Sequence, residues 1–143
     1  MIAHGPVDVF AFALGEPRFD SRVLTELERQ TASGTIRVLD VMVLFKMESG
    51  ECLRMDMEDF APEDLEKLKF NESDKMDLFD SDDAEMFWEG MVPDSAIVAL
   101  AIEHVWAIDL VNDLVDAGAV MAVNYRVPAP VVDEAFASLT DTN

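Results

Sequence analysis

The sequence predicts an α+β fold in which two βαβ repeats share one mostly antiparallel sheet. Two segments, about 7–47 and about 95–127, align with each other, and each has the pattern strand, helix, glycine, strand. A strand–helix–strand crossover is nearly always right-handed. Two such units in one sheet, with their helices packed on one face, form a ferredoxin-like sandwich. The aligned positions are 9–14 with 97–102, Gly34 with Gly118, and 36–40 with 120–124.

The composition is that of one globular domain, 1–143, with an extreme charge. Half of the 143 residues are hydrophobic, which is enough for a core. The chain has 30 acidic and 10 basic residues, a formal net charge of −20. Such a chain repels nucleic-acid phosphates and anionic lipid, so we expect no direct nucleic-acid binding and no membrane binding. A cationic protein partner is compatible with this charge.

Several features predict a cytoplasmic protein. Cys52 is the only cysteine, so an intrachain disulfide is excluded. The first residues contain neither a basic segment nor a long apolar run, so no signal peptide is expected. The longest apolar stretch, 95–102, is far shorter than the roughly 20 residues that cross a bilayer.

The first repeat begins with a strand over 7–14, a short apolar run rich in Val and Phe. Asp20 or Ser21 is expected to cap the helix that follows, by accepting a hydrogen bond from a free amide. Gly34 stands where a helix-ending glycine belongs, because glycine adopts the left-handed conformation without steric cost. The inward face of this helix holds Val23, Leu24, Leu27 and Thr31.

A β-rich run over 35–47 completes the first repeat. Residues 48–51 have the composition of a tight turn. Residues 52–58 then alternate between apolar and polar side chains, which predicts a half-buried hairpin strand paired with the preceding one.

An acidic helical insertion is expected over about 59–94, because 15 of the 30 acidic residues lie between Asp56 and Asp94. Pro62 suits the start of a short helix, and Ser81 suits the cap of a second. This second helix has an apolar stripe that needs cover, so Phe87 and Trp88 are candidate interface residues. The stripe consists of Ala84, Phe87, Trp88 and Met91.

The second repeat is expected to comprise a strand over 95–103, a helix over 106–117 and a strand over 119–127, with a C-terminal helix over about 129–139. The inward residues of the repeat's helix are Ala107, Leu110, Val111 and Leu114. Its outward residues are Asp109, Asn112, Asp113 and Asp116. The apolar face of the last helix consists of Val131, Val132, Ala135, Phe136 and Leu139.

Glu103, His104 and Trp106 form the strongest candidate ligand or interface group, at the turn between a buried strand and a helix. A histidine and a carboxylate at a strand end can serve acid–base chemistry or hold a ligand. The structural alternative, in which Trp106 packs down and His104 satisfies a backbone group, is favoured because no nucleophile lies nearby in the sequence. We therefore assign no catalytic residue.

An acidic cluster within the insertion is a weak candidate for a divalent metal site, since calcium and magnesium prefer oxygen ligands. It lacks the spacing of a calcium loop, so a solvated acidic loop with helix-capping aspartates is favoured. The sequence also has no glycine-rich phosphate loop and no zinc-ligand spacing, so no cofactor is expected. The cluster consists of Asp77, Asp80, Asp82, Asp83 and Glu85.

Three short motifs resemble those of a bacterial, largely actinobacterial, family of small proteins. This family is defined by a domain of unknown function. The resemblance implies the duplicated βαβ, ferredoxin-like pattern over nearly the whole chain. It implies no activity, substrate or catalytic residue. The motifs are Gly5-Pro6-Val7 before an apolar strand, the run from Gly34 to Asp40, and Glu103-His104-x-Trp106-Ala107.

The leading functional hypothesis is a non-enzymatic, homo-oligomeric interaction or assembly module. The reason is that a helix-free sheet face rich in Val and Met needs cover, from the central acidic segment, the last helix or another subunit. The alternative is a protein that binds a small ligand or a divalent metal, through the Glu103–Trp106 turn or the acidic cluster. A second alternative, based on charge alone, is an acidic mimic of a nucleic acid.

Overall fold

The computed structural model of the protein describes residues 1–70 and 78–141. The chain divides into two compact units, Met1–Asp113 and Leu114–Asn143. The elements are β1 (Val7–Leu14), α1 (Ser21–Ala32), β2 (Ile36–Lys46), β3 (Cys52–Asp56), the 3-10 helix η1 (Met57–Asp59), α2 (Pro62–Lys67), α3 (Ser81–Gly90), β4 (Ser95–His104), α4 (Ala107–Asp116) and α5 (Ala129–Asp141).

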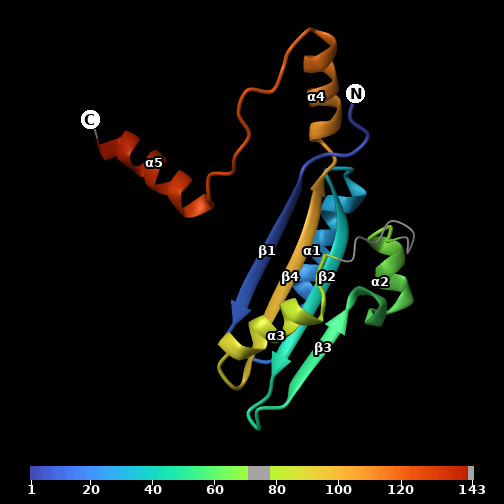
Figure 1. Ribbon diagram of the computed structural model, residues 1–143, viewed down its shortest axis with the longest axis vertical. Coiled ribbons are helices and arrows are strands. Elements are labelled where there is room, and N and C mark those ends of the chain that lie inside the picture. Colours follow the sequence, from blue (N-terminus) through green and yellow to red (C-terminus); the bar gives the residue numbers. More distant parts are fainter. Residues whose placement is uncertain (71–77, 142–143) are drawn as a thin grey trace. The chain divides into compact units, whose positions relative to one another are not determined.

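The first unit is built on a four-stranded sheet with the order β1-β4-β2-β3 (Figure 1), in which every neighbouring pair is antiparallel. β1 and β2 therefore run in the same direction, joined by α1, with β4 between them. β1 pairs with β4 along its whole length, from Val7 opposite Glu103 to Leu14 opposite Ala96. β1 and β3 are the two edge strands. The expected α+β class and mostly antiparallel sheet are confirmed.

The strand expected over 119–127 does not form, and residues 119–128 have no regular secondary structure. The prediction was wrong because apolar alternation shows only that a segment suits a sheet. A strand also needs a neighbour to accept its backbone hydrogen bonds. The hairpin strand expected over 52–58 likewise ends earlier, at Asp56, where the chain turns into η1.

Helices cover both faces of the sheet. The repeat pattern predicts helices on one face and leaves the other to be covered by the central acidic segment, the last helix or another subunit. α1 contributes Leu27 to a core on one face, together with Val41 of β2 and Leu100 of β4. η1, α2 and the residues that flank them add Met57, Phe60 and Leu68 to the same core.

The opposite face is covered by α3, which belongs to the segment expected to be an acidic insertion. Ala84 and Met91 pack there against Met42, Leu44 and Ala99 of the sheet. A register shift between Val38 and Asp40 sets which β2 side chains face α1 and which face α3.

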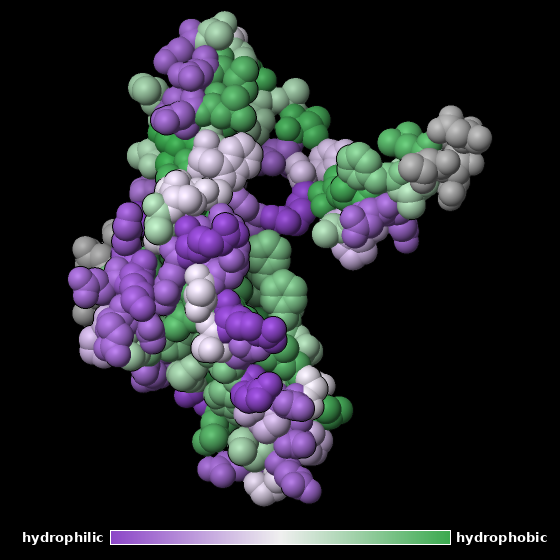
Figure 2. All heavy atoms as spheres, turned by 180° about the vertical axis from the view of Figure 1, so that it is seen from behind, coloured by the Kyte–Doolittle hydropathy of each residue, from purple (hydrophilic) through white to green (hydrophobic). Residues whose placement is uncertain are grey.

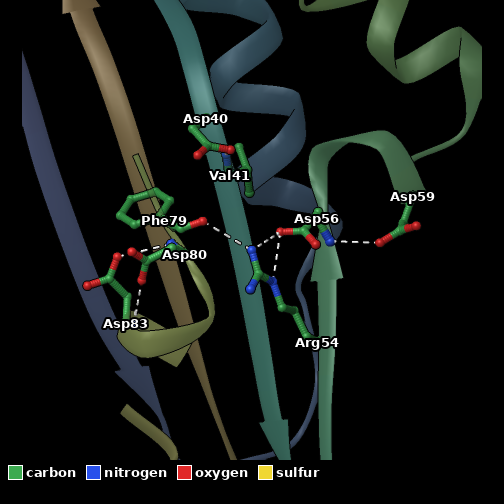
Figure 3. Close-up of polar contacts among 8 residues, drawn as sticks. All are labelled: Asp40, Val41, Arg54, Asp56, Asp59, Phe79, Asp80 and Asp83. Carbon is green, nitrogen blue, oxygen red and sulfur yellow. Dashed lines mark hydrogen bonds and ion pairs between the residues drawn. The ribbon is translucent and has the colours of Figure 1, made fainter. Parts of the chain in front are cut away.

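Local sequence signals explain how the helices begin and end. The Asp20 side chain accepts the backbone N–H of Arg22 at the start of α1 (2.9 Å), and Gly34 follows the helix with a φ of +76°. The cap of α3 is Asp80 rather than Ser81. The Asp80 side chain accepts the backbone N–H of Asp83, and the Asp83 side chain accepts the backbone N–H of Asp80 (Figure 3).

Basic side chains of the sheet hold α3 in place. Arg54 of β3 donates to the carboxylate of Asp56 at 3.0 Å and to the carbonyl of Phe79, just before α3, at 3.1 Å (Figure 3). At the other end of α3, Lys46 of β2 donates to the carbonyls of Trp88 and Met91 at 3.0 and 3.1 Å. A cation at a helix C-terminus satisfies carbonyls that have no partner within the helix.

The orientation expected for α4 is wrong at three positions. Asn112, expected outward, is buried, whereas Leu110 and Leu114, expected inward, are exposed. The reason is that the Asn112 amide bonds both backbone groups of Ile2, with Ile2 N–H donating at 2.7 Å and Asn112 donating back at 3.0 Å. Hydrophobic residues reach the surface where α4 lies, at the top of Figure 2.

Candidate functional site

Charged side chains gather at the end of the sheet where β4 finishes and β1 begins. Glu103 and His104 are the last residues of β4. The register places Arg37 of β2 opposite Glu103, and Asp8 of β1 one pair away. Because successive side chains of a strand point to opposite faces, Glu103 and His104 form two separate groups, one on each face of the sheet.

Glu103 is the centre of the first group, and its side chain is only 2% exposed. One carboxylate oxygen lies 2.7 Å from the guanidinium of Arg37. The other accepts the backbone N–H of Gly5 at 2.8 Å and lies 3.5 Å from Nδ1 of His4. A buried carboxylate is tolerated only with such partners, so this network fastens the N-terminal segment to the end of the sheet.

Gly5 is required at its position by close approach of the backbone. A Cβ at this residue would lie 2.0 Å from the carbonyl oxygen of His104. The next residue, Pro6, accepts the backbone N–H of His104 at 2.8 Å, which extends the pairing of β1 with β4 by one bond. The glycine therefore lets the N-terminal segment lie directly against β4.

His104 is the centre of the second group. Its Nε2 bonds a carboxylate oxygen of Asp8, and its Nδ1 accepts the indole N–H of Trp106 at 3.2 Å. The indole N–H is a donor only, so Nδ1 carries no proton and Nε2 is the protonated nitrogen that faces Asp8. Trp106 itself is 55% exposed. The arrangement orients His104 through both ring nitrogens.

This geometry limits the chemistry that the Glu103–Trp106 turn can perform. Both ring nitrogens of His104 are hydrogen-bonded, and the two carboxylate oxygens of Glu103 lie against the Gly5 N–H and the Arg37 guanidinium. A metal ion or a proton acceptor at His104 would have to displace either Asp8 or Trp106. The role of Glu103, His104 and Trp106 as ligand or interface residues stays a prediction.

The acidic cluster separates into residues with different local roles. Asp77 lies outside the described residues. Asp80 and Asp83 form the capping box of α3, while Asp82 and Glu85 are exposed on its surface. Within 1–70 and 78–141, no three His, Cys, Asp or Glu side chains converge in a way that could hold a metal ion.

The two aromatic interface candidates pack within the chain. Phe87 and Trp88 are both half-buried against the core between α3 and the sheet. The predicted apolar stripe of α3 is therefore confirmed, and it packs against the sheet of the same chain. Their expected role in an interface stays a prediction.

Sequence reasoning assigned no site role to Asp8, Arg37 or His4, and it named Gly5 only as part of a family motif. A signal was present for two of them, because Asp8 is the one charge in its strand and Arg37 is one of a few charges in a mostly apolar strand. A charge in a buried strand requires an opposite charge nearby. The partners of both charges, however, lie on β4, which is distant from them in the sequence.

None of the helices in the described ranges has the length and apolar composition needed to span a bilayer. The fold and this end of the sheet define an α+β protein with a four-stranded antiparallel sheet, a helix packed on each face and a fastened N-terminal segment. The chain belongs to the family of unknown function DUF6325, whose model matches residues 3–142. Neither the curated proteins nor the solved structures contain a match to it.

Proposed function

We propose that the protein is a non-enzymatic, homo-oligomeric interaction or assembly module. The observation that carries this proposal is the outer edge of β1. This strand pairs with β4 on one side and is the end of the sheet on the other. Several of its apolar side chains are exposed, including Val9 at 58% and Phe12 at 54%. A long apolar edge strand is a template for pairing with another chain unless a protein blocks it.

The second unit supports the same proposal. Its hydrophobic side chains are exposed along the segment before α5 and along α5 itself. Soluble monomers rarely expose contiguous apolar surface of this kind, and such surface marks interaction sites. The exposed set is Val120, Met121, Val123, Tyr125, Val127, Val131, Phe136 and Leu139.

The net charge of −20 sets how the assembly should respond to salt. Like-charged copies repel each other, and added salt screens this repulsion over a Debye length of about 10 Å at 0.1 M. Light scattering after size exclusion, across protein concentration and from low to high salt, tests the proposal. We expect a dimer or larger species, favoured by salt. A monomer under every condition overturns the proposal.

Binding of a small ligand or divalent metal at the Glu103–Trp106 turn is the second candidate. The observation in its favour is that Trp106, an exposed aromatic, lies beside a histidine already coupled to a carboxylate. Melting curves with calcium, magnesium, zinc and manganese test the metal version, because a ligand that binds the folded state raises the melting temperature. Unchanged curves with all four ions exclude it.

A further inference from the structure

We propose that residues 119–127 of one copy form a fifth strand on the outer edge of β1 in a second copy. This proposal deepens the assembly function and rests on it. The resulting sheet would have the order segment 119–127, β1, β4, β2, β3. Its first four strands then have the connectivity of the ferredoxin-like fold that the repeat pattern predicts, with β3 as an addition at the far edge.

The segment has the properties of a missing edge strand. It is one residue longer than β1, and its hydrophobic residues are exposed, with Tyr125 at 77%. It is rich in Val and contains no proline before Pro128. A segment of this composition and an edge strand of similar length fit recognition by strand addition.

Charge selects one register. β1 has a single charged residue, Asp8, and 119–127 has a single charged residue, Arg126, which is also the only basic residue after Lys75. In an antiparallel pair with Asp8 opposite Arg126, Val7 lies opposite Val127 and Leu14 opposite Val120. Every other pair in this register is uncharged, and opposite charges directly across a sheet are favourable. In a chain with so few bases, this is a specific complementarity.

The chain's own segment is too short to reach this register. Asn112 of α4 is bonded to Ile2, at the end of the sheet where β1 begins. From Asn112 to Val120, four helical steps and four extended steps span at most about 20 Å. Val7 and Leu14 alone are about 23 Å apart along β1, and Ile2 precedes Val7 by five residues. Pairing of Val120 with its own Leu14 would therefore require a fully stretched connection or loss of the Asn112–Ile2 bonds, whereas a second copy has no such limit.

Cysteine pairs in a Cys52→Ser background test the register and the source of the strand. Val9→Cys and Tyr125→Cys lie opposite each other in the proposed pairing, and both positions are exposed, so we expect these variants to fold. Two differently tagged chains, one with each cysteine, are mixed and treated with a short bismaleimide. We expect a crosslink between the two chains. Val9→Cys mixed with Met121→Cys is the matched control, offset by four residues or about 13 Å, and should crosslink at least about tenfold less.

Prolines test whether the pairing uses the backbone. Ala122→Pro and Val123→Pro each remove one N–H from the segment, and at adjacent residues one of the two must face β1. We expect at least one of them to weaken dimerisation by about tenfold or more. Ala129→Pro is the control, because it places a proline at the first residue of α5, where a helix tolerates it.

The outcomes separate this inference from the assembly function. An oligomer that neither crosslinks between Val9→Cys and Tyr125→Cys nor responds to the prolines overturns the strand addition and leaves assembly intact. A crosslink within a single monomeric chain that carries both cysteines overturns the exchange between copies. A wild-type monomer at all concentrations overturns both proposals.

Discussion

The backbone N–H of Gly5 donates to the buried carboxylate of Glu103 at 2.8 Å, across 98 residues of sequence. This bond joins the segment before β1 to the C-terminal end of β4. It is possible only because Gly5 has no side chain, since the His104 carbonyl occupies the place of a Cβ. The contact therefore requires a residue without a side chain at position 5 and a carboxylate at position 103.

Gly5→Ala should lower the free energy of unfolding by about 2 kcal/mol or more, because a Cβ would meet backbone atoms that have little freedom to move. Urea denaturation followed by circular dichroism measures the change. Gly15→Ala is the matched control, because a Cβ there meets no atom within 4 Å, and it should shift stability by less than about 0.5 kcal/mol. Equal effects of the two substitutions would contradict the close approach.

Glu103→Ala should destabilise the protein by about 3 kcal/mol, because it removes a buried carboxylate that lies 2.7 Å from the partly buried guanidinium of Arg37. Arg37→Ala should cost a similar amount for the reciprocal reason. The double variant should cost clearly less than the two single changes added together, since the groups that each substitution isolates are then both absent. Strict additivity in denaturant unfolding would show that the pair is not coupled.

The neutral imidazole of His104 should carry its proton on Nε2, because Trp106 donates to Nδ1 and Asp8 accepts at Nε2. Nitrogen-15 chemical shifts of the ring at high pH distinguish the two tautomers. Trp106→Phe removes the indole donor and should shift the Nδ1 resonance while leaving the fold unchanged, since Trp106 is largely exposed. A proton found on Nδ1 in the wild type would rule out this arrangement.

The pKa of Asp20 should be about 2, below its usual value of 3.8, because the Arg22 side chain and backbone both donate hydrogen bonds to its carboxylate. A carboxyl-carbon NMR titration measures it. Because the folded pKa is depressed, the stabilisation is complete above the unfolded pKa and is lost as the pH falls through about 2.

Arg22→Ala should raise the pKa of Asp20 back towards 3.8, since it removes the side-chain donors. Arg29→Ala serves as the control. Arg29 pairs instead with Glu26, at 2.6 Å, and should leave the titration of Asp20 unchanged while raising the low pKa of Glu26. An Asp20 titration that is insensitive to Arg22→Ala would show that the cap does not depend on this arginine.

The candidate site was predictable in part. The position of Glu103 and His104 at the end of a strand followed from the apolar run that precedes them, and the structure places both there. Their partners were not predictable, because Asp8 and Arg37 meet β4 only after β1 and β2 have taken their places beside it. The inward turn of Asn112 was missed for the same reason, since it depends on Ile2, which lies 110 residues away.

The sequence by itself determined the elements whose causes are local. The cap at Asp20, the glycine after α1, the hairpin of β2 with β3 and the apolar stripe of α3 all depend on residues within a few positions of one another. Only the tertiary structure decided the strand order, the cover of both sheet faces and the fastening of Gly5 to Glu103. A strand also exists only where a neighbour accepts its hydrogen bonds, and for this reason residues 119–127 have the pattern of a strand but are not one in this chain.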